Sequence, residues 1–440
     1  MHGRQACVQA GGVPCHACQD GAHGANEVLS RRKSTTTQKK LLVAALTLSV
    51  PSAALAQTTI TGRVFGTLNV NLQNTRQNGV ANRFAVSTDS SNVGWLGDVE
   101  LYPWLKAVAR CETSANIDGI SVSGICNRNS RVGLSTDWGT LFYGNWDTPF
   151  KAVTYGTKAD DPFLSTDVFG YQGIMGSPGF NYRSGTFVTA PGTTVGGFDV
   201  RAGNSVAYWS PNVMGLGLKA QWSVNEYKNA SGSLSPMLFS VALNYDNGPI
   251  SFLAVYERHD DSFALNAVNG TTRQFGATAA NPTTVSSADS AWRAGAGYEL
   301  TSPIGSTRLG VLVDQLTLGQ DGAPTGAVKE YKRLAWQVAL TQRIGSHEFR
   351  ARYNMALSGD CQLVGVATCS TNGYGARDVA LGYAYYFAKS TQVFLSYAKI
   401  FNEEKAQYTF SVGGDTSAVA GQTFPGSDPS ALGFGVRYAF

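Results

Sequence analysis

Strict alternation of apolar and polar residues is the feature that most constrains the fold of this chain. A period of two predicts a β-strand with two unlike faces, because successive side chains of a strand point to opposite sides. The alternation recurs around 333–341 and 347–355. No apolar run of the roughly twenty residues that a membrane-spanning helix needs occurs after residue 56. The clearest strand is the last, whose large apolar residues are Leu432, Phe434, Val436, Tyr438 and Phe440.

Two features distinguish a membrane barrel from a soluble β-sandwich, which also alternates. The polar faces keep charges at mid-strand, as a wet interior requires, whereas the apolar faces end in aromatic residues typical of membrane interfaces, such as Tyr385 and Phe387. Tight turns, as at 344–346, alternate with long polar stretches, as at 402–427. We therefore expect short turns at one end of a barrel and long loops at the other.

The fold class expected is all-β, a sixteen-stranded antiparallel transmembrane β-barrel whose first and last strands pair. Closure removes the unpaired strand edges that lipid does not tolerate, and about sixteen strands leave an aqueous channel. The expected strands are 59–73, 92–98, 105–113, 129–136, 140–146, 203–210, 216–226, 236–245, 249–258, 288–299, 307–317, 330–342, 346–356, 375–387, 391–401 and 429–440.

An export signal precedes the barrel. Basic residues between 31 and 40 are followed by the apolar run 41–50 and by Ala54-Leu55-Ala56, the small-x-small pattern that a signal peptidase accepts. We expect a signal peptide over 28–56, cleavage after Ala56, and a β-barrel domain over 57–440. The alternative is a short membrane anchor, although the apolar run is too short to span a bilayer as a helix.

Residues 1–27 do not fit a normal signal peptide. Their three cysteines and two of their histidines allow a metal knuckle, but we favour a start codon assigned too far upstream, with Val28 as the start. No metal site is expected. The residues of the alternative knuckle are Cys7, Cys15, Cys18, His16 and His23.

The charge balance and the cysteines both follow from export. Six of the 34 Lys and Arg residues and two of the 30 Asp and Glu residues lie in 1–56. Residues 57–440 therefore hold 28 of each and have no basic excess that would indicate nucleic-acid binding.

An oxidising compartment predicts disulfides between Cys111 and Cys126 and between Cys361 and Cys369. A zinc site built from the four thiolates is the alternative, disfavoured because neither pair has metal-ribbon spacing.

Several fragments, in this order, resemble the general (trimeric, sixteen-stranded) Gram-negative outer-membrane porin family of β-proteobacterial type. They are ITGRVFGTLNVNL (60–72), Leu105-Lys106-Ala107, SRVGLSTDWGTLFY (130–143), NSVAYWSP (204–211), GLGLKAQW (215–222) and GVRYAF (435–440). The resemblance implies an outer-membrane homotrimer surrounded by lipid and lipopolysaccharide. It also implies that the barrel-assembly machinery reads the terminal Phe440, and that a third loop, expected at about 147–180, folds inward as a constriction.

These expectations predict a general diffusion pore for small hydrophilic solutes and ions, with no cofactor and no catalysis. Basic side chains on the wall face acids on the inward loop, and the transverse field orients solutes and biases ion selectivity. The expected basic wall, against which the third loop should lean, is Arg63, Lys106, Arg110 and Arg131. The expected loop acids are Asp147, Asp160, Asp161 and Asp167. Strand parity also directs into the lumen Lys219, Arg293, Arg308, Arg350, Arg352 and Arg437, with Glu112, Glu299, Asp314, Glu348 and Asp378.

The sequence departs from the family pattern at two places. Residues 99–104 read VELYPW where relatives have an acidic residue and a Gly run, and Asn145 follows Gly144 where relatives place a constriction Arg. One member of the basic ladder is therefore missing. We expect weak selectivity with a slight preference for anions.

Three other functions are considered. A substrate-specific channel needs lumen-facing aromatics, and only Phe65 and Trp209 are candidates, since most Trp and Tyr fall on the lipid-facing parity. A non-channel protein such as an adhesin is the second. A barrel hydrolase needs a Ser/His/Asp-type or Asp/His constellation, but 57–440 holds only His259 and His347, and His259, beside two aspartates, is expected in a solvated loop.

Overall fold

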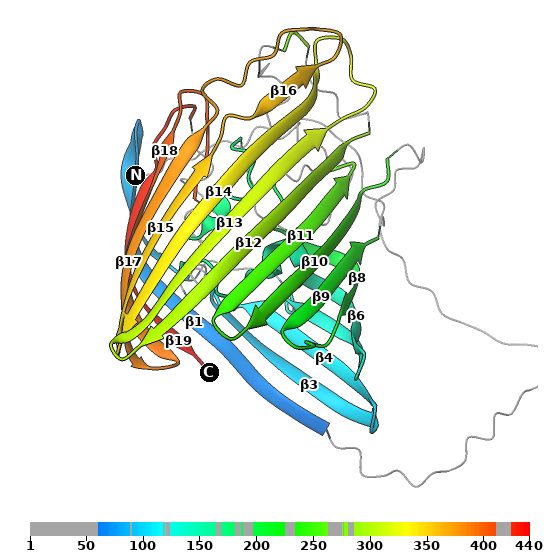
Figure 1. Cartoon of the computed structure of the whole chain (residues 1–440), viewed down its shortest axis with the longest axis vertical. Helices are drawn as coiled ribbons and strands as arrows, with labels where there is room; N and C mark the ends of the chain where they lie inside the picture. Colours follow the sequence, from blue (N-terminus) through cyan, green and yellow to red (C-terminus); the bar gives the residue numbers. More distant parts are fainter. Residues whose placement is uncertain are drawn as a thin grey trace, which may run out of the picture. The chain divides into compact units, whose positions relative to one another are not determined.

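The two ends of the barrel sequence meet as neighbouring strands. β1 (Ile60–Gln77) pairs antiparallel with β19 (Ser430–Ala439), as the sequence predicts. This pairing closes a single sheet (Figure 1) and leaves no long strand edge, which lipid would not tolerate. The computed structural model describes residues 60–440 except 89, 118, 120–123, 164–168, 181–185, 188–196, 225–233, 263–274, 276, 280–285 and 411–423. The expected signal peptide, its cleavage site and the cysteines of 1–27 lie outside the described residues.

The order of elements follows the chain around the sheet, each strand beside its neighbour in sequence. The elements between β1 and β19 are β2 (Val80–Ser87), β3 (Asn92–Tyr102), β4 (Leu105–Ser114), β5 (Ser130–Thr136), β6 (Gly139–Asp147), α1 (Pro149–Ala152), the 3-10 helix η1 (Tyr171–Gly173), β7 (Thr186–Phe187), β8 (Arg201–Trp209), β9 (Leu216–Ser223), β10 (Met237–Asn247), β11 (Ile250–Asp260), β12 (Ala288–Ser302), β13 (Gly305–Gly319), β14 (Val328–Ile344), β15 (His347–Ala356), β16 (Asp360–Leu363), β17 (Ala376–Ala388) and β18 (Thr391–Asn402).

Within the described residues these elements form the sixteen strands of the barrel wall. β2 and β3 both pair with β1 and together count as one barrel strand. β15 and β16 both pair with β14 and likewise count as one. β7 is a two-residue pairing parallel to β8. The prediction of a sixteen-stranded antiparallel barrel is confirmed. The sequence analysis missed β2, although Phe84 and Val86 alternate on its exposed face, and it missed β16, which has only the four residues DCQL.

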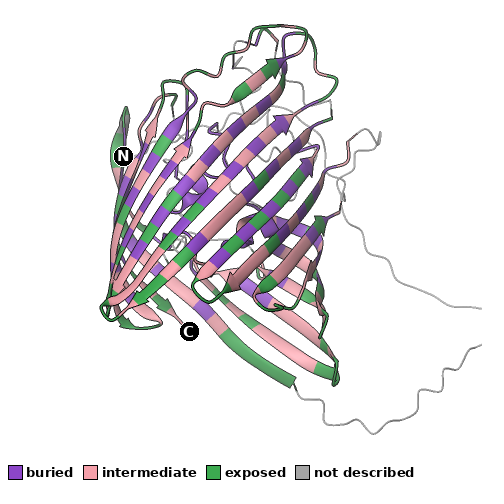
Figure 2. Ribbon diagram, in the orientation of Figure 1, coloured by how far each residue is buried: buried purple, intermediate pink, exposed green. Residues whose placement is uncertain are grey.

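The two faces of the sheet differ in the way that a lipid exterior requires. In β19 the predicted apolar residues are exposed, Phe434 by 56% for example, whereas Ala431 on the other face is 1% exposed. Figure 2 shows the same alternation of exposed and buried residues along the other strands. An outward apolar band with a polar interior is the arrangement of outer-membrane barrels.

The connections also follow the prediction. The short turns between β10 and β11, β12 and β13, and β14 and β15 lie together at the lower end of Figure 1. Gly248 and Gly345 occupy two such turns with φ of 56° and 58°, a conformation that glycine adopts without steric cost. Both predicted disulfides are present, Cys111–Cys126 and Cys361–Cys369, with Cα–Cα distances of 4.7 and 5.9 Å.

No helix within the described residues is both long and apolar enough to cross a membrane.

Candidate functional site

The third loop connects β6 to β8, and its described parts, residues 148–163, 169–180 and 197–200, fold against the inner face of the barrel wall. Where the loop meets the wall, the wall residues are small. A Cβ on Gly297 (β12) would lie 2.1 Å from the backbone carbonyl carbon of Lys158, and one on Gly382 (β17) would lie 2.7 Å from the ring of Phe163. The loop backbone therefore approaches this wall closely enough that only glycine fits.

The wall that holds the loop is not the one that the sequence reading predicted. We expected the loop to lean on the early strands that carry Arg63, Lys106, Arg110 and Arg131. Residues 156–163 and 169–180 instead contact strands between β10 and β19, so for these parts of the loop that expectation is wrong. The physical reason is that the buried polar groups of the loop find their charged partners on the later strands.

Arg293 of β12 is the main anchor of the loop. Its side chain is fully buried, and its guanidinium donates to both carboxylate oxygens of Asp199 at 3.1 and 3.2 Å, to Asp314 of β13 at 3.1 Å, and to the hydroxyl of Tyr171 at 3.0 Å. Phe150 lies under the guanidinium, 4.2 Å from its carbon to the ring centre. A buried charge is tolerated only where it is paired and hydrogen-bonded, as this one is.

Two further buried arginines extend this anchor. Arg333 of β14 donates to the carbonyl oxygens of Ile174 and Ser177 in the loop and contacts Asp314 at 3.4 Å. Arg352 of β15 pairs with Asp161 of the loop at 2.9 Å and with Asp378 of β17 at 2.6 Å. Sequence parity had directed Arg293, Arg352, Asp314 and Asp378 inward, but it had omitted Arg333, although this residue lies on the polar parity of its own strand.

The described acids that we expected to line the constriction are already engaged in ion pairs or hydrogen bonds with the protein. Asp147 pairs with Arg201 at 3.0 Å and Lys151 at 3.2 Å, and Asp161 pairs with Arg352. Asp160 accepts a hydrogen bond from the backbone N–H of Gly156, but burial raises its pKa from the ordinary value to about 7. Asp167 lies outside the described residues.

The early strands carry a basic row. Arg63 of β1 lies opposite Leu96 of β3, Leu96 opposite Arg110 of β4, and Arg110 opposite Arg131 of β5. The three arginines therefore share the inner face with Leu96, since directly opposed residues of antiparallel strands point to the same side of the sheet. Lys106, two residues before Val108 on this face, lies opposite Glu100, so its charge is partly compensated.

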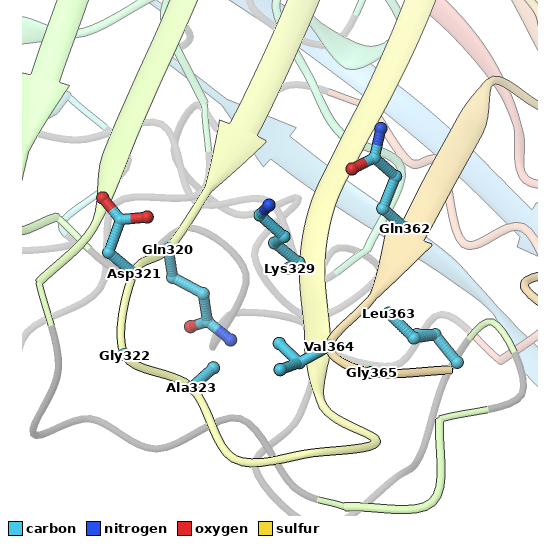
Figure 3. A pocket seen from close by; sticks show the side chains of 9 residues that line it. All are labelled: Gln320, Asp321, Gly322, Ala323, Lys329, Gln362, Leu363, Val364 and Gly365. Carbon is cyan, nitrogen blue, oxygen red and sulfur yellow. The ribbon is translucent and has the colours of Figure 1, made fainter. Parts of the chain in front are cut away.

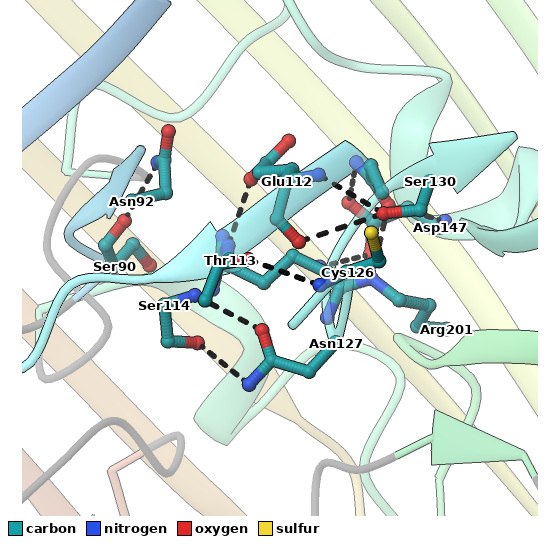
Figure 4. A network of polar contacts seen from close by, with 12 residues as sticks. Ser90, Asn92, Glu112, Thr113, Ser114, Cys126, Asn127, Ser130, Asp147 and Arg201 are labelled. Carbon is teal, nitrogen blue, oxygen red and sulfur yellow. Dashed lines mark hydrogen bonds and ion pairs between the residues drawn. The ribbon is translucent and has the colours of Figure 1, made fainter. Parts of the chain in front are cut away.

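A polar network fixes the second loop to the top of this row (Figure 4). Glu112 accepts from Arg110 at 2.5 Å and from Arg128 at 2.8 Å, and its backbone N–H donates to Ser130. Cys126 donates its backbone N–H to Thr113 beside the disulfide. The segment 124–130 is therefore tied to β4 by a covalent bond and by charge-assisted hydrogen bonds.

Asn145, which stands where relatives place an arginine, has a structural part in this region. Its side-chain N–H groups donate to the carbonyl oxygens of Asn127 at 3.3 Å and Arg128 at 3.2 Å. The register of β6 with β8 shifts between Gly144 and Trp146. The extra residue lies on β8, which takes three steps from Ser205 to Ala202 against two on β6, and Trp146 keeps the inner-face parity of Phe142.

The remaining lumen-facing cations lie on the inner face in different settings. Lys219 lies 5.2 Å from the ring centre of Trp209, and Arg350 is held by Glu348, Tyr386 and Gln392. Arg308 lies opposite Glu299 on the inner parity of β12 and β13, and Arg437 alternates with the exposed residues of β19.

The two histidines do not form a catalytic group in the described part of the barrel. His259 is 1% exposed, contacts Glu257 at 2.8 Å and stacks on Phe198 of the third loop at 4.6 Å, so the expectation of a solvated loop residue is wrong. His347 is exposed and contacts the hydroxyl of Tyr383. No three His, Cys, Asp or Glu side chains among the described residues are placed to hold a metal ion.

A small cavity of about 280 Å³ lies at the loop end, between the β13–β14 connection and β16 (Figure 3). Gln320 and Lys329 line one side and Gln362 the other, with the backbone around Gly322 and Gly365 between them. Its lining offers the amides of Gln320 and Gln362 and two opposite charges, Asp321 and Lys329.

The sheet is closed and sixteen-stranded, its outer face is apolar, its inner face is charged, and the third loop lies inside it. These features define a transmembrane β-barrel of the outer-membrane class. A model of the Gram-negative porin family matches residues 42–405. The chain belongs to this family and is an outer-membrane protein.

Curated relatives include major outer membrane protein P.IB of Neisseria meningitidis serogroup B, which is 26% identical over 231 residues, 50% of this chain and 60% of that protein. Outer membrane porin protein 32 of Delftia acidovorans is 27% identical over 221 residues, 48% of this chain and 58% of that protein. The aligned part thus spans about three fifths of these relatives.

Solved structures share the fold over most of the chain. An anion-selective porin from Comamonas acidovorans superposes with a TM-score of 0.63 at 19% identity, covering 87% of this chain and all of that one. OmpT of Vibrio cholerae in its trimer form gives 0.56 at 15% identity, covering 87% and 100%.

Proposed function

We propose that this barrel is a diffusion pore for small hydrophilic solutes and ions. The observation that carries the proposal is the third loop, which is anchored inside the barrel by buried arginines and lies across from a basic row on the early strands. A loop held in this way narrows the lumen without filling it. Passage then needs no cofactor, since the wall supplies only a polar, charged surface.

The sign of the selectivity follows from which charges are already paired. Asp147 and Asp161 of the loop region are each matched by cations. Arg131, by contrast, has no ion pair or side-chain hydrogen bond within the described part of the barrel, and it lies directly opposite Arg110. The constriction therefore carries unmatched positive charge, and we propose weak selectivity with a slight preference for anions.

Reversal potentials in planar bilayers under a salt gradient test this proposal. We expect the wild-type pore to favour chloride over potassium weakly, and Arg131→Gln to reduce the chloride share. Arg258→Gln is the matched control, because Arg258 is half exposed and pairs with Asp260 at the end of β11. A strong cation preference of the wild type, or an unchanged reversal potential in Arg131→Gln, would contradict the proposed constriction.

The assembly is also a proposal. Trimer forms occur among the similar structures, such as OmpT, and we propose a homotrimer in lipid and lipopolysaccharide, assembled through the C-terminal strand that ends at Phe440. Single-channel recordings of a trimer should close in three equal steps, and a single step would contradict it.

A further inference from the structure

Aromatic rings and cations alternate along the inner face of the early strands. In order, the belt consists of Phe65 (β1), Arg110 (β4), Trp146 (β6), Arg131 (β5), Phe142 with Trp209 (β6 and β8), and Lys219 (β9). We name these seven residues the aromatic–cation belt. General electrostatics explains single cation–ring contacts, but a continuous row across six strands on a lumen wall calls for a further explanation.

The distances show that each of the two arginines lies between rings. The guanidinium carbon of Arg110 is 4.3 Å from the ring centre of Phe65 and 5.3 Å from that of Trp146. That of Arg131 is 4.8 Å from Trp146, 4.8 Å from Phe142 and 5.5 Å from Trp209. The three rings nearest Arg131 also pack edge to face or tilted, with centres 5.2 to 5.4 Å apart. The belt is therefore a rigid surface.

The belt also carries unmatched hydrogen-bond donors. Within the described residues, Nε of Arg131, Nε of Arg110 and Nε1 of Trp209 are buried and have no acceptor. Arg131 has no carboxylate partner there either. Buried donors and charges without partners are costly, so a wall that keeps them is suited to an incoming acceptor with negative charge.

We propose that the aromatic–cation belt is a binding track for organic anions that carry a planar aromatic ring, that is, aromatic carboxylates. The carboxylate meets the guanidinium of Arg131, while the ring of the ligand packs on Phe65 and Trp209, the belt rings that are only partly buried. This inference rests on the proposed pore function and assigns that pore a favoured class of solute.

The choice of an aromatic carboxylate over a simple oxyanion rests on the rings. An inorganic anion would use only the cations, and a row of cations without rings would serve it equally well. Aromatic pairs gain about 0.5–1.5 kcal/mol beyond the burial of their area. We therefore expect a planar ring to bind about threefold to tenfold more tightly than a saturated ring of the same size.

The wild-type pore gives the primary test and needs no variant. Benzoate, cyclohexanecarboxylate and acetate are added in turn at low ionic strength, and the block of the chloride current is measured. We expect benzoate to block at a concentration about threefold to tenfold lower than cyclohexanecarboxylate, with acetate weakest. Equal block by benzoate and cyclohexanecarboxylate would overturn the proposal and leave the pore function standing.

Variants locate the effect. Trp209→Leu removes one ring and its N–H, and we expect it to abolish the difference between benzoate and cyclohexanecarboxylate. Tyr386→Leu removes a lumen ring that lies 4.2 Å from the guanidinium carbon of Arg343 on the later strands, outside the belt, and the difference should persist. Loss of the difference in Tyr386→Leu alone would place the site elsewhere and overturn the proposal.

Absence of any conductance in the wild type would refute the pore rather than the belt. The belt is then tested by titration calorimetry of the folded protein in detergent with the same three acids. Benzoate binding at least threefold tighter than cyclohexanecarboxylate supports the track, and equal or absent binding overturns it.

Discussion

Gly297→Ala tests the placement of the third loop through a single added methyl group. An ideal Cβ at this position lies 2.1 Å from the carbonyl carbon and 2.5 Å from the carbonyl oxygen of Lys158, whereas ordinary contacts begin at 3.4 Å. The loop backbone must therefore retreat by about 1.3 Å, toward the lumen, because the wall is on the other side. The retreat strains the hydrogen bond from the N–H of Lys158 to Ser251, now 3.0 Å. Overpacking of this kind costs about 1–3 kcal/mol.

Alanine substitutions at two other glycines, Gly310 and Gly62, provide a weaker overlap and a control without overlap. A Cβ on Gly310 would lie 3.1 Å from Ala159, a mild overlap, and one on Gly62 would have its nearest neighbour at 3.8 Å. We expect single-channel conductance and the thermal unfolding midpoint in detergent to fall most in Gly297→Ala, less in Gly310→Ala and not in Gly62→Ala. Equal values in Gly297→Ala and Gly62→Ala would show that the loop does not rest on β12 as described.

Two further predictions concern the charges of the third loop. Arg293→Met leaves Asp199 buried without its partner, so we expect a loss of about 3–5 kcal/mol in urea unfolding, partly restored when Asp199→Asn is added; an additive double variant would contradict the pairing. The pKa of Asp160 in the folded protein, about 7, is higher than that of an Asp in the unfolded chain. The protonated form therefore stabilises the fold at low pH, and this stabilisation is lost as the pH rises from about 4 through 7. Asp160→Asn should flatten the thermal midpoint over this range, and an unchanged slope would argue that another group titrates there.

The architecture could be predicted because lipid imposes it locally. Any strand exposed to lipid on one face and water on the other must alternate, so β19 and β15 are visible in the sequence without knowledge of their neighbours. The bounds were less accurate where alternation is weak. β1 continues to Gln77 through the polar run 73–77 and pairs there with β2.

Alternation along each strand predicted which charged side chains lie on the inner face. The charged residues directed inward lie on the face opposite the exposed apolar side chains, and Trp209, named as a candidate inward aromatic, contacts Lys219. Trp146 lies on the same parity as the buried Phe142, so alternation directs it inward as well, although the sequence analysis did not name it.

The wall that receives the third loop was the main error, and the sequence contains a signal that bears on it. A strand interior normally disfavours glycine, yet Gly297, Gly382 and Gly433 all lie on inner-face positions of later strands, and each is covered by a loop residue. A wall that faced only water would gain from larger side chains at these sites. Inner-face glycines far from turns therefore indicate where another backbone or ring packs, and the buried arginines between them indicate charges that the incoming segment must match. The early strands instead carry arginines on the inner face that contact rings of the wall itself, as Arg131 contacts Phe142 and Trp146.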